Sequence, residues 1–248
     1  MPARHLFGAL AVLIAVWQAV VWAFDPPHFI LPGPVRVAEA FWKSRALIGE
    51  HALTTLTEVM IGLAIGALLG AATAVQLAGS VRAQAILRPI LVFSQAIPVF
   101  ALAPLLTLWF GYGLWSKVVM AVLIIYFPVT STFFDGLMRT PAAYLDMARV
   151  MGATERAIMW RIRVPNALPA LASGLRLGAV YAPIGAVIGE WVGSSNGLGY
   201  LMLLANGRAK IDLMFAAVIA LGVISVTLYW LVDSVLAKWL GKGQSANA

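Results

Sequence analysis

The feature of this sequence that most restricts its fold is a series of six long apolar stretches. They cover residues 6–24, 58–78, 87–110, 115–134, 168–192 and 213–237. A helix needs about 20 apolar residues to cross a hydrocarbon core about 30 Å thick. The apolar residues run continuously instead of alternating, which predicts helices and not the strands of a barrel. The sequence therefore predicts an all-α, polytopic membrane bundle of six transmembrane helices.

Composition excludes the other broad classes. The chain of 248 residues is 62% hydrophobic and 11% charged, whereas a soluble domain is about 45–50% apolar and about 25% charged. A net charge of +7 would also suit a nucleic-acid binder, but the basic residues lie between the apolar runs instead of forming a patch. There is no cysteine, and the three histidines are too far apart to predict a metal site. We expect neither a metal nor a nucleic-acid partner.

The first apolar stretch has two readings. Arg4 precedes it, as in a secretory signal peptide. It is, however, longer than a usual signal core, and no clean cleavage site follows. We therefore expect an uncleaved span with a cytoplasmic N-terminus, which places the C-terminus in the cytoplasm as well. With that orientation, 11 of the 17 Lys and Arg residues lie inside, as the positive-inside rule requires.

The predicted spans suggest three regions. Residues 1–50 would hold the first transmembrane helix and an outer interfacial segment, in which Pro34 suits the first turn of a short helix. Residues 51–237 would form a core domain, and residues 238–248 a cytoplasmic tail.

Glycine and proline residues recur inside the spans. Rows of glycines lie on one face of the second and fifth spans, at positions 62, 66 and 70, and 174, 178, 185, 189 and 193. Such rows favour close helix packing, with lining of a pore as the alternative. Prolines 98, 104, 128 and 183 predict kinks in the third, fourth and fifth spans.

The longest inner loop, residues 135–167, predicts two short helices. Thr140 would cap the first, which begins at Pro141 and ends near Met151, where Gly152 is a natural stop. Thr154 would cap the second helix, which we expect to end before Pro165.

This loop also carries a spaced motif. Its residues are Asp146, Met147, Ala148, Gly152, Ile162, Val164 and Pro165, with Ala153 and Thr154 beside the glycine. The motif resembles the signature loop of ABC importer permeases: Glu-Ala-Ala, three residues, Gly, nine residues, Ile, one residue, Leu-Pro. Four positions match, and Asp146 and Val164 are conservative changes. Met147 departs further, because it puts a long side chain where the family usually has alanine.

The resemblance implies a fold and a set of partners. It implies the type I ABC importer permease fold, in the bacterial inner membrane, with this loop docking on a separate ATP-binding subunit. The chain has no phosphate-binding loop of its own, so we expect no enzymatic activity and no cofactor here, with ATP used by the partner. The implied partners are two ATP-binding subunits, an extracytoplasmic substrate-binding protein, a second copy of this chain and membrane lipid.

Further motifs point to a branch of that family. Residues 97–113, which include Ile97-Pro98 and Trp109-Phe110-Gly111, are similar to the nitrate, sulfonate and taurine permeases. Residues 189–202 most resemble permeases for hydroxymethylpyrimidine, a thiamine precursor. We therefore expect import of a thiamine precursor, with sulfonate, taurine or nitrate as the alternative.

Three polar residues within the spans are candidates for the translocation pathway. Glu190 is either a wet interfacial carboxylate beside Trp191 or part of a gate. Gln95 either bonds across helices or lines the path, and Tyr181 lies beside Pro183.

Two other classes of protein are less consistent with the sequence. A secondary transporter would be expected to show internal repeats or intramembrane ion-coupling charges, and neither is clear. A membrane enzyme would need a convergent catalytic set, which is not visible.

Overall fold

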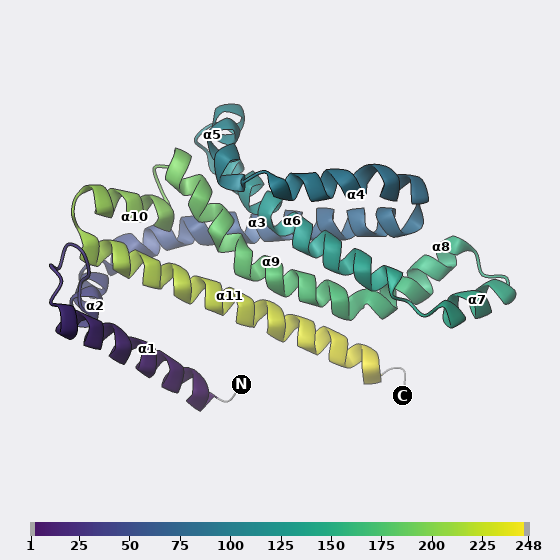
Figure 1. Ribbon diagram of the computed structural model, residues 1–248, viewed down its shortest axis with the longest axis horizontal. Helices are drawn as coiled ribbons and strands as arrows, with labels where there is room; N and C mark the ends of the chain where they lie inside the picture. The colour runs from purple at the N-terminus through teal and green to yellow at the C-terminus, as the bar shows by residue number, and fades with distance from the viewer. Residues whose placement is uncertain (1–2, 246–248) are drawn as a thin grey trace.

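A computed structural model describes residues 3–245, and these residues fold almost entirely into helices (Figure 1). In chain order the first helices are α1 (Ala3–Phe24), α2 (Pro34–Lys43), α3 (Arg45–Gly79), α4 (Val81–Ala96), α5 (Val99–Phe110) and α6 (Leu114–Met138). They are followed by α7 (Ala142–Val150), α8 (Glu155–Ile158), a π-helical turn at Met159–Arg163, α9 (Val164–Gly193), α10 (Leu198–Gly207) and α11 (Ile211–Ser245). Met1, Pro2 and the last three residues of the predicted tail lie outside the described residues.

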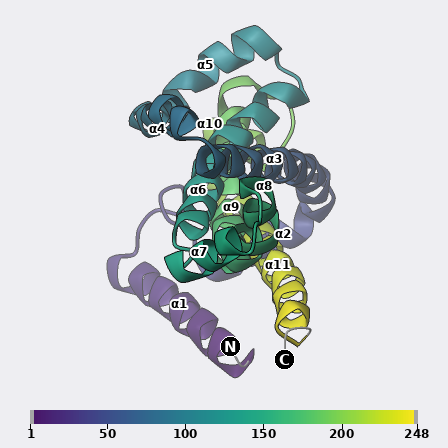
Figure 2. The ribbon, with the colours of Figure 1, turned by 90° about the vertical axis from the view of Figure 1, so that its right-hand side faces the viewer.

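Helices α3, α6 and α9 form the centre of the bundle, and α11 packs along α9. Helices α7 and α8 lie at one end, and α2 and α10 at the other (Figure 1). We call these the elbow end and the α10 end. Viewed from the elbow end, α5 and α1 project from opposite sides of this centre (Figure 2).

The glycine rows are packing surfaces, as expected. A β-carbon at Gly62 of α3 would lie 2.5 Å from the Ala121 β-carbon of α6, and one at Gly185 of α9 would lie 2.6 Å from the Ala121 α-carbon. Helix α6 is therefore held between α3 and α9 at distances that only glycine allows. These positions face a neighbouring helix in the described chain, which argues against the alternative of a pore lining.

Part of the predicted span count is confirmed. Within the described residues, four helices are long and apolar enough to cross a membrane: α3, α6, the α8–α9 segment and α11. The predicted third span is two helices, α4 and α5, bent by 99°. The reason is Pro98, which disfavours a helical conformation at Ile97, and Ile97 is extended with ψ 118°. With α1 and the bent pair the count would reach six, which stays a prediction.

The other prolines have a weaker effect. Pro104, Pro128 and Pro183 lie inside α5, α6 and α9, and each of these helices continues through its proline.

Helix α2 begins at Pro34, as expected for the interfacial segment. Helix α3, however, starts at Arg45, well before the predicted second span. The predicted region boundaries at residues 50 and 237 consequently fall inside the continuous helices α3 and α11.

A few polar and aromatic contacts hold helices α1 and α2 against the rest of the bundle. The Trp17 indole of α1 donates to the Pro32 carbonyl at 3.1 Å and stacks on Phe215 of α11. Arg36 of α2 pairs with Asp212 of α11 at 3.2 Å.

Candidate functional site

The elbow between α7 and α8 is built around Gly152. This residue has φ +81°, a left-handed conformation that glycine adopts at little cost. Its N–H donates to the Arg149 carbonyl at 2.9 Å, and the Ala153 N–H donates to the Ala148 carbonyl at 2.9 Å. The α7 carbonyls are thereby satisfied as the chain reverses.

The motif residues of the elbow divide into a packed set and an exposed set. Ala148 and Ile158 form a small core with Leu145, and Ala153 and Ile162 pack against it. The other motif residues near the turn, Asp146, Met147, Gly152 and Thr154, are exposed. The packed motif residues Ala148, Ala153 and Ile162 thus hold α7 and α8 together. The exposed motif residues are free to contact a partner.

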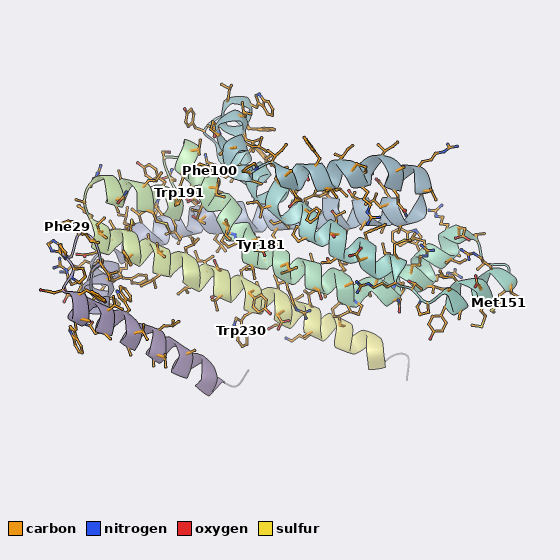
Figure 3. All side chains as sticks on the ribbon, in the orientation of Figure 1. Phe29, Phe100, Met151, Tyr181, Trp191 and Trp230 are labelled. Carbon is orange, nitrogen blue, oxygen red and sulfur yellow. The ribbon has the colours of Figure 1, made fainter. Side chains whose placement is uncertain are left out.

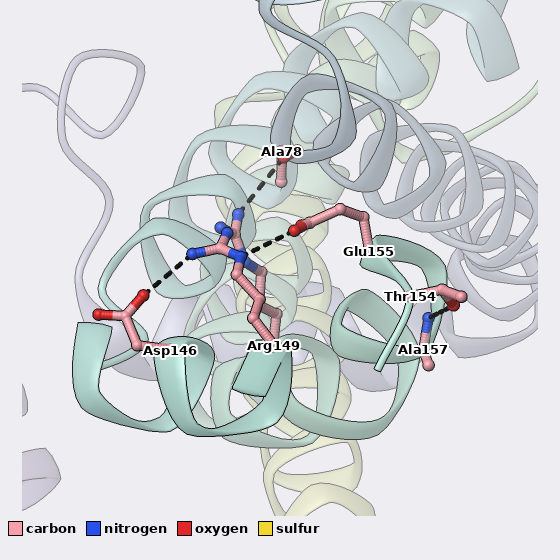
Figure 4. Close-up of polar contacts among 7 residues, drawn as sticks. Ala78, Asp146, Arg149, Thr154, Glu155 and Ala157 are labelled. Atoms are coloured by element: carbon pink, nitrogen blue, oxygen red, sulfur yellow. Dashed lines mark hydrogen bonds and ion pairs between the residues drawn. The ribbon is translucent and has the colours of Figure 1, made fainter. Parts of the chain in front are cut away.

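A charged bridge closes the elbow (Figure 4). The Arg149 guanidinium donates to Asp146 at 3.1 Å within α7 and to Glu155 at 2.9 Å at the start of α8. The hydrogen bond from Arg149 lowers the pKa of the Glu155 carboxyl. The Thr154 hydroxyl accepts the Ala157 N–H at 3.2 Å, which confirms the predicted cap of α8. Sequence reasoning did not find the role of Arg149, although its spacing from Asp146 suits a helical ion pair.

Two details of the predicted loop are wrong. Thr140 does not cap α7, because its hydroxyl donates back to the Leu137 carbonyl at 3.1 Å and Pro141 takes the cap position. The second helix does not end before Pro165. It passes through the π-helical turn directly into α9, which starts at Val164. The wider π-helical turn leads into the first turn of α9, where a proline is tolerated.

The tip of the elbow is apolar. Tyr144, Met147, Val150 and Met151 are all exposed, with Val150 at 88% and Met151 at 79%. Met151 lies at the extreme end of the molecule (Figure 3). An uncovered apolar patch of this kind indicates an interaction surface.

Gln95 and Tyr181 lie on a second feature, a groove of about 460 Å³ on the flank of the bundle. Tyr181 projects from α9 near the middle of the molecule (Figure 3). The groove is lined by Gln95, Val99, Leu123, Ile124, Phe127, Pro128, Ser131, Thr132, Leu177 and Tyr181. The structure therefore brings two of the three candidate pathway residues together from distant parts of the chain.

Glu190 lies elsewhere, buried near the α10 end with 1% of its surface exposed. Its carboxylate accepts the Thr55 hydroxyl at 2.6 Å and the Gly199 N–H at 2.5 Å. This contradicts the hypothesis of a wet interfacial carboxylate. The Glu190 carboxyl lies at the N-terminus of α10, where the helix dipole favours a negative charge.

Helix α3 supplies further caps for α10. His51 and Thr55 lie one turn apart, and both are buried. The His51 Nδ1 accepts the Gly197 N–H at 3.0 Å, and the Thr55 hydroxyl accepts the Leu198 N–H at 2.8 Å. With Gly199, three successive backbone donors at the start of α10 are held by side chains of α3 and α9.

A second acid and a lysine complete this buried cluster. Glu58 is 2% exposed and Lys117 is 1% exposed. The Lys117 ammonium donates to three backbone carbonyls, those of Tyr112, Gly113 and Gly193. Sequence reasoning placed both residues at span ends and missed the cluster. The available signal was a charge at the edge of an apolar run, but nothing in one sequence pairs Glu58 with Glu190.

Comparison with known proteins identifies the family. Residues 62–241 match the family of binding-protein-dependent transport system inner membrane components, and the chain belongs to this family. A probable ABC transporter permease protein of Haemophilus influenzae is 50% identical over 93% of this chain and 94% of its own length.

Two further relatives are named for particular solutes. A riboflavin transport system permease protein of Chloroflexus aurantiacus is 37% identical over 96% of this chain and 91% of its own length. A formylaminopyrimidine transport permease protein of Halalkalibacterium halodurans is 35% identical over 93% of this chain and 94% of its own length. More distant relatives are named for aliphatic sulfonate and taurine transport, which agrees with the predicted branch.

The fold has a counterpart among solved structures. A methionine ABC transporter described as inward-facing aligns with a TM-score of 0.60 at 19% identity, over 83% of this chain and 96% of the other chain. The architecture is thus the type I ABC importer permease fold. Family membership makes the chain a multi-pass permease of the inner membrane. It also implies a separate ATP-binding subunit and a substrate-binding protein as partners.

Proposed function

We propose that this permease forms the pathway through which a thiamine precursor of the hydroxymethylpyrimidine type enters the cell. The observation that carries the proposal is the segment 189–202, which resembles permeases for that precursor. The 35% identity to a permease named for formylaminopyrimidine supports the same chemistry.

Two alternatives follow from other relatives. The 37% identity to a permease named for riboflavin favours a second nitrogen heterocycle. The similarity to permeases named for sulfonate and taurine supports an anionic solute as a further alternative substrate. Uptake of labelled solutes distinguishes these three candidate substrates.

The test is growth and uptake in a thiamine auxotroph that can use an external pyrimidine precursor. We expect deletion of the gene to abolish growth on the precursor, and plasmid-borne wild type to restore it. Uptake of labelled riboflavin and labelled taurine is measured in the same strains. Unchanged growth with loss of riboflavin or taurine uptake would reassign the substrate accordingly.

We also propose that the groove of Gln95 and Tyr181 faces a second copy of this chain across the pathway. Besides Gln95 and Tyr181, the groove offers Ser131 and Thr132, which can bond a polar solute. Beside it, α4 has no buried residue, and Val92 and Phe93 are 62% and 67% exposed. A homodimer would cover this face. The role of Glu190 in this proposal is gating at the α10 end, not contact with solute in the groove.

The elbow is the proposed docking site of the ATP-binding subunit, one subunit per permease copy. Its exposed apolar residues Met147, Val150 and Met151 suit an apolar cleft on that partner. ATP is used by that subunit and not by this chain. With the elbow in the cytoplasm, both termini are cytoplasmic and the α10 end faces outward.

A further inference from the structure

The two buried acids at the α10 end cannot both be ionised in this arrangement. Glu58 lies one turn after Thr55 on α3, and the Thr55 hydroxyl donates to Glu190 at 2.6 Å, so both carboxyls belong to one buried cluster. Burial and the charge of the other acid both disfavour a second negative charge there, so the pair holds one proton. When both are counted as acceptors, Glu58 Oε2 is buried without a partner. A single proton on the pair gives that oxygen a hydrogen-bond partner.

The geometry assigns this proton to Glu58. Glu190 already accepts donors at both oxygens, from Thr55 and from Gly199. Lys117 does not supply the missing donor, because its three protons point at the carbonyls of Tyr112, Gly113 and Gly193. With Glu58 neutral, the charges of Lys117 and Glu190 cancel, which a buried site requires.

The groups facing the pair come from three helices. Helix α3 supplies His51, with exposed Glu50 beside it, and α6 supplies Lys117. Helix α10 supplies Tyr200, whose ring lies 5.9 Å from that of His51. His51 uses Nδ1 to accept the Gly197 N–H, so that nitrogen carries no proton in the closed arrangement.

The same pair holds the turn between α9 and α10 in place. The Glu190 carboxyl lies so close to this turn that a β-carbon at Gly197 would be 2.2 Å from its carboxyl carbon. If the turn lifts away, Glu190 loses the Thr55 and Gly199 donors. Both carboxyls then meet water, where glutamate ionises at neutral pH, and one proton is released.

We propose that Glu58 and Glu190 form a one-proton latch that keeps α10 closed against α3 and α9. The closed state binds one more proton than the open state. Raising the pH therefore favours opening, by about tenfold per pH unit. Lowering the pH keeps this end of the permease closed. The proposal does not depend on which solute is carried.

The chain has no cysteine, so a single introduced thiol reports opening. Leu201→Cys places the thiol on the buried face of α10, at a residue 1% exposed and outside the latch hydrogen bonds. Glu39→Cys lies on the exposed surface of α2 and serves as the reference. Its labelling rate corrects for the pH dependence of the reaction between a thiol and maleimide. Both are labelled with an impermeant maleimide in proteoliposomes of the assembled transporter, buffered alike on both sides.

We expect the ratio of the two labelling rates to rise about tenfold per pH unit in the otherwise wild-type chain. In the Glu58→Gln background the ratio should stay low and flat, because glutamine, like the protonated acid, carries a donor but cannot ionise. In the His51→Gln background, where glutamine can still accept the Gly197 N–H, the slope should persist.

Several outcomes would overturn the latch. One is a flat ratio in the wild-type background. Another is an unchanged slope, or fast labelling at every pH, in the Glu58→Gln background at normal membrane abundance. Loss of the slope in the His51→Gln background would assign the proton to His51 instead. If the Glu58→Gln protein does not accumulate, the comparison of the wild-type and His51→Gln backgrounds decides. An equal pH dependence of the labelling ratio in these two backgrounds supports the latch.

Discussion

At the scale of single residues, two glycines carry different constraints. Gly152 has a positive φ, and a β-carbon there would meet nothing within 4 Å. Gly197 also has a positive φ, and a β-carbon there would strike Glu190. The first constraint is therefore one of backbone conformation alone, and the second is one of conformation and space.

We expect Gly152→Val to uncouple transport while leaving membrane abundance normal. A β-branched residue with positive φ is strained by roughly 1–3 kcal/mol, and it adds bulk on the proposed docking surface. Uptake, copurification of the ATP-binding subunit and membrane abundance are measured together. The matched control is Gly152→Asn, because asparagine tolerates this conformation. Normal uptake by the valine variant at normal abundance would remove Gly152 from the coupling mechanism.

Gly197→Ala should lower the thermal stability of the permease. The cost combines strain of roughly 1–3 kcal/mol with displacement of the Glu190 carboxyl. Gly207→Ala is the control, since it lies at the far end of the same helix and an added β-carbon there would meet nothing within 4 Å. The measurement is the melting temperature of both variants in detergent. Equal melting temperatures would mean that the turn between α9 and α10 moves aside at no cost.

At the scale of elements, the bend between α4 and α5 is the main departure from the predicted spans. It depends on one residue, because Pro98 keeps Ile97 extended. Pro104 lies within α5 and does not end it. Pro98 therefore stands at the break between two helices, whereas Pro104 is accommodated inside one.

Pro98→Ala should reduce uptake more than Pro104→Ala does. Alanine at position 98 lets Ile97 become helical, so that α4 and α5 can join and withdraw from the groove of Gln95 and Tyr181. The comparison is the initial rate of solute uptake at equal membrane abundance. Similar rates for the two variants would show that the bend does not shape the pathway.

At the scale of the whole molecule, the two ends of the bundle carry different chemistry. The elbow end has an exposed apolar tip beside the Arg149 bridge, and the α10 end has a buried cluster of two acids and a lysine. This asymmetry suits a protein whose ends work in different compartments.

Topology reporters test that orientation. A reporter fused after Lys238 should read cytoplasmic, and one placed between residues 25 and 50 should read outside. The physical basis is the excess of Lys and Arg on the elbow side. Reversed signals at both positions would invert the assignment of the two ends.

The sequence by itself determined the helical membrane class, the family and the position of the elbow. These features depend on local properties: runs of apolar residues, a turn glycine, and a motif of fixed spacing within one loop. Gly152 and Thr154 could be assigned in advance because a helix end is decided by its own few residues. The packing role of the glycine rows was equally accessible, since spacing of four places them on one face.

Tertiary structure alone decided which distant residues meet. Gln95 and Tyr181 share a groove only because α4 and α5 bend beside α6 and α9. The pairing of Glu58 with Glu190, and the use of Lys117 on backbone carbonyls, depend on where three helices cross. Helix α10 was not foreseen at all, because its first donors are satisfied by His51, Thr55 and Glu190 instead of by a local cap. Long-range contacts of this kind leave no periodic trace in a single sequence, so only the folded arrangement reveals them.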